Sequence, residues 1–212
     1  MKKILLHGSG HRAASWDQTI SYMTDTEDIL CPDLSLLLEG KEATYEHLYA
    51  SFAAYCNRID GPVHLCGLSL GGVLAADYAL EFPQKVKTLV LIGTPYKVPK
   101  AALAVQSIVF RLLPKSLFDP MAFDKKNTLR LGASMKNIDF SSKAGRIQCP
   151  ALILCGEKDR ANMSSARAFT QHIKHAELNV IENTGHVVNE ENPRMLAAIL
   201  NDYYASYGDL PR

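Results

Sequence analysis

The chain has 212 residues, 47% of them hydrophobic, which suits a single domain with a sizeable core. Its 23 Lys and Arg residues nearly balance its 22 Asp and Glu residues, and the net charge is +1. This balance gives no electrostatic reason to expect nucleic acid or a membrane as a partner, so we expect a small-molecule substrate.

Five cysteines are scattered along the chain without a C-x-x-C pair, and no histidine is spaced with them as a zinc ligand. Such a pattern is typical of a reducing compartment. The run Ile4-Leu5-Leu6 near the start is too short for the apolar part of a signal peptide. No apolar run reaches the length of about 18 residues expected of a transmembrane helix. We therefore predict a cytoplasmic protein.

Strand and helix patterns alternate in the first half of the chain. We expect four strands there, at residues 2–6, 28–31, 63–66 and 88–92. The helices between them are expected at 13–23 and 45–58 and from Ser69 to about Pro83. Pro32-Asp33 should turn the chain from the second strand into a polar loop. Alternation of this kind predicts a parallel sheet whose strands are joined by right-handed helical crossovers.

The pattern is interrupted at residues 96–147, which are richer in Phe, Leu and Lys and have helical spacing at 101–113 and 122–135. We interpret this segment as a helical cap inserted into one domain that spans residues 1–212. Apolar side chains of this segment could line an acyl pocket or simply pack on the sheet; they include Leu103, Ile108, Phe110, Leu112 and Phe118.

Strands resume after the interruption. A fifth strand is expected at 150–155 and a sixth at 177–181, with a helix at 164–172 between them. A closing helix is expected at about 193–204, with Asn192 as its N-cap. Glu190 and Glu191 precede that helix and suit its positive end.

The stretch from Pro62 to Pro83 carries the strongest local signal. Its buried strand breaks at Gly67-Leu68-Ser69-Leu70-Gly71 and resumes as a helix. A serine in such a turn is exposed at the carboxyl edge of the sheet, and glycines on both sides are needed where strand and helix approach closely. Ser69 is thus a candidate nucleophile, although G-x-S-x-G alone also fits an ordinary turn.

Two further residues follow later strands at the same expected edge. Asp159 comes after the fifth strand and His186 after the sixth. A serine hydroxyl needs an imidazole to take its proton, and the imidazole needs a carboxylate that fixes its tautomer and stabilises its charge. The order Ser69, Asp159, His186 therefore predicts a catalytic triad. Asp159 could instead cap the next helix, but residues 93–97 contain no carboxylate that would replace it as the acid.

Negative charge that develops on a carbonyl oxygen also needs donors that are already in place. The Leu70 N–H at the start of the helix after Ser69 can supply one. The loop His7-Gly8-Ser9-Gly10 should supply the other, through the Ser9 N–H. His7 fits a brace for this loop better than a proton carrier.

Several segments together resemble one family. They are HGSG at 7–10, GLSLGG at 67–72, LIGTP at 91–95, CPALILCGEKD at 149–159 and GH at 185–186. With them the chain resembles the α/β-hydrolases, and among these the small esterases and lactonases that include 3-oxoadipate enol-lactonases. The resemblance implies a three-layer α/β fold with a six-stranded parallel sheet in the order 2-1-3-4-5-6, the family's first two strands being absent, and a short helical cap.

The resemblance also implies the roles given above to Ser69, Asp159 and His186. We expect a serine hydrolase that cleaves a small carboxylic ester, thioester or lactone through an acyl-enzyme and needs no cofactor or metal. Carbon–carbon hydrolysis and perhydrolysis use the same triad and stay open. The alternative from another class is a ligand sensor on this fold; a third reading is a relic whose triad is misaligned.

Overall fold

The structure of the protein, a computed structural model, describes residues 1–98 and 100–207. Six parallel strands form one sheet in the order β2-β1-β3-β4-β5-β6, as predicted. The strands are β1 (Lys3–Leu6), β2 (Ile29–Leu30), β3 (Val63–Leu68), β4 (Val86–Ile92), β5 (Ala151–Gly156) and β6 (Ala176–Ile181). This arrangement confirms the predicted fold class.

The central strands β3 and β5 are buried at every residue. A strand covered on both faces has no solvent side, so its sequence is a continuous apolar run rather than an alternating one. The strand register pairs Leu6 with Gly67 and Leu68 with Ile92. The carboxyl ends of β1, β3 and β4 therefore lie together at one edge of the sheet.

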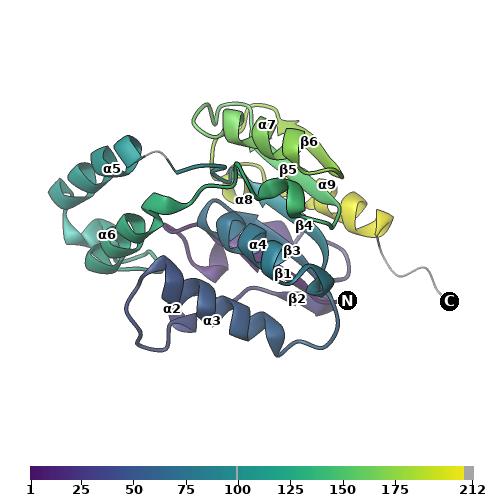
Figure 1. The fold of residues 1–212 in the computed structure, drawn as a ribbon, viewed down its shortest axis with the longest axis horizontal. Coiled ribbons are helices and arrows are strands. Elements are labelled where there is room, and N and C mark those ends of the chain that lie inside the picture. The colour runs from purple at the N-terminus through teal and green to yellow at the C-terminus, as the bar shows by residue number, and fades with distance from the viewer. Residues whose placement is uncertain (99, 208–212) are drawn as a thin grey trace.

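Helices cover both faces of the sheet (Figure 1). One face packs against α3 (Tyr45–Asn57), α4 (Leu70–Glu81) and α7 (Met163–His172), whose buried side chains belong to one apolar cluster. The other face packs against a second cluster. Its helices are α1 (Asp17–Ile20), which continues the 3₁₀ helix Ala13–Trp16, α8 (Val188–Glu191) and α9 (Pro193–Ser206). The result is a layer of helices on either side of the sheet.

The segment between β4 and β5 contains α5 (Lys100–Leu112), the 3₁₀ helix Lys115–Phe118 and α6 (Lys125–Ser134), close to the two helices predicted there. Figure 1 shows α5 and α6 extending away from the sheet on one side. The two ends of the segment run side by side, because the Phe140 N–H donates to Tyr96 O and the Val98 N–H to Ile138 O. That residues 96–147 act as a cap stays a prediction.

One local prediction is wrong, and another is correct for the residue but not for its side chain. Residues after Asp33 form the short helix α2 (Leu34–Leu37) rather than a polar loop, because Asp33 Oδ1 accepts the Ser35 N–H and Leu34 is fully buried. Asn192 stands at the start of α9, but its side chain donates to Thr184 Oγ1 instead of capping the helix. In the part of the chain that the structure describes, we find no helix with the length and apolar character to cross a membrane.

Candidate active site

Ser69 lies in a sharp turn between β3 and α4. Its φ of 52° and ψ of −111° place it in a region that residues with a side chain rarely adopt. Added Cβ atoms would lie 2.2 Å from the Gly71 carbonyl carbon at Gly67 and 2.4 Å from the Leu6 oxygen at Gly71. Only glycine fits at both positions, and the turn is held in place because the Ser69 N–H donates to Ile92 O at 2.8 Å.

His7 braces the loop that follows β1. It is fully buried, and its Nε2 accepts the Leu34 N–H at 3.0 Å. The proton is therefore on Nδ1, which donates to Gly8 O at 2.8 Å. Burial lowers the pKa of His7 despite the opposing effects of the Gly8 carbonyl and the Asp33 carboxylate. A neutral imidazole that makes two backbone hydrogen bonds matches the predicted brace.

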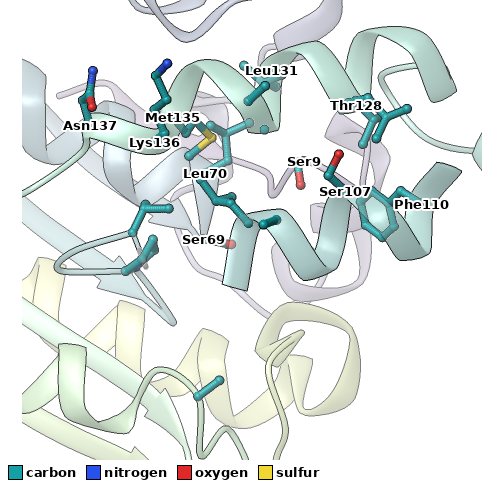
Figure 2. A pocket seen from close by; sticks show the side chains of 18 of the residues that line it. Ser9, Ser69, Leu70, Ser107, Phe110, Thr128, Leu131, Met135, Lys136 and Asn137 are labelled. Carbon is teal, nitrogen blue, oxygen red and sulfur yellow. The ribbon is translucent and has the colours of Figure 1, made fainter. Parts of the chain in front are cut away.

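The braced loop touches the serine turn. A Cβ built on Gly8 would lie 3.6 Å from Ser69 Cβ. The Ser9 and Leu70 N–H groups form no hydrogen bond within the described part of the chain. Ser9, Ser69 and Leu70 line the same cavity, as Figure 2 shows. The two predicted oxyanion donors thus both lie beside Ser69 with their N–H groups unused.

Asp159 and His186 form the second part of the site. His186 Nδ1 lies 2.7 Å from Asp159 Oδ2, and the Asp159 side chain is 4% exposed while that of His186 is 38% exposed. Burial alone would raise the pKa of Asp159, but hydrogen bonds from His186 and Asn162 outweigh it and lower the pKa. The carboxylate therefore stays ionised and holds the His186 proton on Nδ1, which leaves Nε2 free to accept one.

Asn162, which the sequence reading did not single out, completes this pair. Its side-chain amide donates to both carboxylate oxygens of Asp159 at 3.0 Å. Its backbone N–H reaches Asp159 Oδ1 at 3.3 Å. Asp159 therefore binds both His186 and Asn162, the residue that precedes α7, whereas the N-cap position of α7 belongs to Asn162 itself.

Gly93 brings the pair to the end of β4. Its φ is +51°, and an added Cβ would lie 2.9 Å from His186 Nδ1 and 3.1 Å from Asp159 Oδ2. The preceding residue, Ile92, accepts the Ser69 N–H. Two successive residues at the end of β4 thus contact different parts of the site: Ile92 contacts Ser69, and Gly93 contacts the Asp159–His186 pair. Among the described residues no hydrogen bond joins Ser69 Oγ to the His186 ring, a contact that in unliganded sites often tightens only when substrate binds.

Glu191 holds the loop that carries His186. Its carboxylate accepts the Gly185 N–H at 2.7 Å and the Val187 N–H at 3.1 Å. The sequence suggested the positive end of the closing helix as its partner, whereas the carboxylate turns back to the residues on both sides of His186. Glu190, its neighbour, takes no N–H from this loop and lies 3.9 Å from His11 Nε2. The only sequence signal for this contact was an acidic residue five positions after His186.

A cavity of about 1000 Å³ opens beside Ser69. Its walls come from the sheet edge and from the segment 96–147, and Figure 2 shows Ser107 and Phe110 of α5 and Thr128 and Leu131 of α6 around it. Most of the lining is apolar. Its members from the segment include Val98, Leu103, Phe110, Leu129, Leu131 and Met135.

The five apolar residues singled out in the segment divide between two environments. Leu103 and Phe110 line the cavity, and Phe118 is buried and packs edge-on against Phe110. Ile108 and Leu112 face solvent with 59% and 81% of their surface exposed. Helical spacing therefore predicted the helix correctly but not which of its faces meets the cavity.

Residues 1–98 and 100–207 contain no group of three or more His, Cys, Asp or Glu side chains placed to hold a metal ion. The five free cysteines are not part of the site, and burial raises the pKa of Cys155 to about 11. The groups that the site brings together are a hydroxyl, an imidazole, a carboxylate and backbone N–H groups.

Comparison with known proteins bears on the family and the fold. The model of the alpha/beta hydrolase family matches residues 4–199. Monoacylglycerol lipase ABHD6 of Homo sapiens is 22% identical over an alignment of 256 residues that covers 96% of this chain and 75% of the lipase. The (E)-2-((N-methylformamido)methylene)succinate hydrolase of Acinetobacter baylyi is also 22% identical, over an alignment of 223 residues that covers 90% of this chain and 85% of the hydrolase.

Solved structures match over almost the whole chain. A thermophilic esterase from Thermogutta terrifontis superposes with a TM-score of 0.81 at 19% identity and covers 98% of this chain and 90% of the esterase. At this level of identity the match shows the shared fold.

Proposed function

The chain belongs to the alpha/beta hydrolase family, and on that premise we propose that it cleaves a carboxylic ester through an acyl-enzyme formed on Ser69. The observation that carries the proposal is the turn at Ser69, whose strained backbone holds the serine on the wall of the cavity. The Asp159–His186 pair lies against Gly93, the residue after the one that binds the Ser69 N–H.

The reaction follows from these groups. As Ser69 Oγ attacks the ester carbonyl, its proton passes to His186 Nε2, and the ionised Asp159 stabilises the imidazolium through Nδ1. The Ser9 and Leu70 N–H groups donate to the oxygen that becomes negative. The C–O bond then breaks, and the alcohol leaves with the proton from His186. Water, deprotonated by His186, then attacks the acyl carbon. The bond from this carbon to Ser69 Oγ breaks, His186 returns the proton to Ser69 Oγ, and the acid leaves.

The apolar cavity supports an acyl ester as the substrate. A volume of about 1000 Å³ is large enough for a substrate with a medium or long acyl chain, and most of its lining is apolar. Relatives described as a monoacylglycerol lipase and an esterase act on bonds of this kind. A thioester or lactone would react by the same steps.

Turnover of p-nitrophenyl esters from acetate to decanoate tests the proposal. The Ser69→Ala variant should lose about 10⁴-fold or more in kcat with its fold intact, because the nucleophile is gone. Ser116→Ala, which changes an exposed serine outside the cavity, is the matched control and should retain wild-type turnover. A fluorophosphonate should label the wild type and the control but not Ser69→Ala.

Full activity in purified Ser69→Ala would refute the nucleophile assignment. Tight ligand binding without turnover of any ester, in protein that the fluorophosphonate fails to label, would favour the ligand sensor instead.

A further inference from the structure

The outside of the segment 96–147 exposes an unusual amount of apolar surface. Ile108 and Val109 of α5 are 59% and 46% exposed, Leu112 at its end is 81% exposed, and Leu117 of the adjoining 3₁₀ helix is 50% exposed. We call these four residues the outer patch. Scattered exposed apolar side chains are normal, but four within ten residues mark a surface that meets something other than water.

Helix α5 is apolar on two opposite sides. Leu103, Ser107 and Phe110 line the cavity that contains Ser69. Ile108 and Leu112 lie one turn apart on the side that faces solvent, with Val109 beside them. A surface helix normally has one apolar stripe, which faces the core, and a polar opposite side. The second apolar side of α5 has no partner among the described residues.

The outer patch is accompanied by cations. Arg111 and Lys115 are exposed, and no described carboxylate forms an ion pair with either of them. Residues 108–118 contain no Asp or Glu. Lys125 adds a third positive charge, because its Nζ donates to the carbonyl oxygens of Arg111 and Leu113. The nearest acidic residues in the sequence are Asp119 and Asp124, and Asp124 caps the start of α6.

This combination fits an anionic lipid surface better than a second copy of the chain. In a two-fold symmetric dimer built on the outer patch, Arg111 and Lys115 would face the same cations of the other copy. At a lipid surface, Ile108, Leu112 and Leu117 can enter the acyl boundary while the cations stay at the level of the anionic headgroups. The cations would then strengthen binding instead of opposing it.

We propose that the outer patch docks the protein on a membrane surface that contains anionic lipid. Docking would put the outer side of α5 in the lipid while its inner side still lines the cavity beside Ser69, so that a lipid-borne molecule has a short path to it. The expectation of no membrane partner rested on the net charge of +1, which averages over the whole chain and does not describe one surface.

Sedimentation with vesicles tests the proposal without depending on turnover. Wild-type protein should bind vesicles of phosphatidylcholine with phosphatidylglycerol and bind pure phosphatidylcholine much less. Leu112→Ser should lower the partition coefficient about tenfold. The double variant Arg111→Glu, Lys115→Glu should lower it by more than tenfold, and added salt should weaken wild-type binding. Met195→Ser, on α9 and 51% exposed, is the matched control and should bind as the wild type does.

Other results would overturn the proposal. These are no sedimentation of the wild type, equal binding to both kinds of vesicle, or equal binding by all four proteins. A concentration-dependent dimer that Leu112→Ser abolishes, with no vesicle binding, would assign the outer patch to a second copy. Circular dichroism of each variant shows that a loss of binding is not a loss of fold.

Discussion

The edge of the sheet and the segment 96–147 both border the cavity, but they are held by different kinds of interaction. At the sheet edge, positions are fixed by backbone hydrogen bonds and by glycines with no room for a Cβ, as at Gly67 and Gly71. In the segment, apolar packing is supplemented by side-chain hydrogen bonds, such as those from Lys125 Nζ to the carbonyl oxygens of Arg111 and Leu113, and part of the apolar surface remains exposed. If the proposed function is right, the catalytic groups lie in the tightly fixed first region, and the second region contacts the rest of the substrate.

The largest expected difference between the two regions is the effect on kcat of neutralising one carboxylate in each. Asp159→Asn should reduce kcat about 10³- to 10⁴-fold, because an amide can no longer keep the His186 proton on Nδ1 or stabilise the imidazolium. Asp139→Asn removes the partner of Lys97, 2.7 Å away at the partly exposed base of the segment, and should leave kcat within about twofold. Steady-state ester hydrolysis measures both, and equal effects would remove the distinction between the regions.

The sheet edge could be predicted from the sequence because its signals are local. A strand buried on both faces is a continuous apolar run, and the glycines around Ser69 mark a close approach that no other residue permits. Asp159 and His186 could be placed because parallel strands end at one edge. The strand order was predicted in a different way, from a family resemblance that extends over most of the chain.

Other features depend on contacts that spacing does not encode. Glu191 turns back to the Gly185 and Val187 N–H groups, and an acidic residue before a helix fits several partners equally well. The short helix α2 is stabilised by the burial of Leu34, and the polar residues Pro32-Asp33 before it gave no sign of that burial in the sequence. In α5, periodicity reveals an apolar face but not what lies against it, so Phe110 and Leu112 could not be told apart.

Replacing one glycine in each region should give the second difference, which is in the free energy of unfolding. Gly71→Ala would place a Cβ 2.4 Å from the Leu6 carbonyl oxygen, so backbone must shift, and we expect a loss of about 3 kcal/mol in the free energy of unfolding. Gly132→Ala in α6 meets nothing within 4 Å and should gain about 0.5–1 kcal/mol, because alanine favours the helix. Urea unfolding of both variants tests this; a mild effect at Gly71 would mean that the edge is as adaptable as the segment.

Two adjacent glutamates test whether the His186 loop is positioned by its neighbour. Glu191→Gln weakens the two hydrogen bonds that flank His186, and kcat should fall about tenfold with little change in KM, since charged acceptors bind N–H groups more strongly than neutral ones. Glu190→Gln changes the same kind of exposed side chain without touching the loop and should have little effect. Similar kcat values in the two variants would count against a positioning role for Glu191.

The smallest expected effect is a dependence of stability on pH that comes from His7, since residues 96–147 contain no histidine. Burial lowers the pKa of His7 in the folded protein, so below the unfolded value of about 6.5 the unfolded chain binds the proton more readily. Its contribution to stability is therefore complete above that pH and is lost as the pH falls toward the folded pKa. The Asp33 carboxylate opposes this lowering of the pKa, whereas the charges of His11 and Arg12 lower the pKa as burial does.

His7→Gln should separate this contribution from other acid effects. Glutamine can accept the Leu34 N–H and donate to Gly8 O but does not titrate, so the variant should be less stable overall yet depend less on pH below about 6.5. The difference in slope should approach at most about 1.4 kcal/mol per pH unit, the limit for one proton. Urea unfolding across that pH range measures it. Parallel curves would mean that the loop beside Ser69 tolerates a charged His7, and the brace would then be less rigid than its two hydrogen bonds imply.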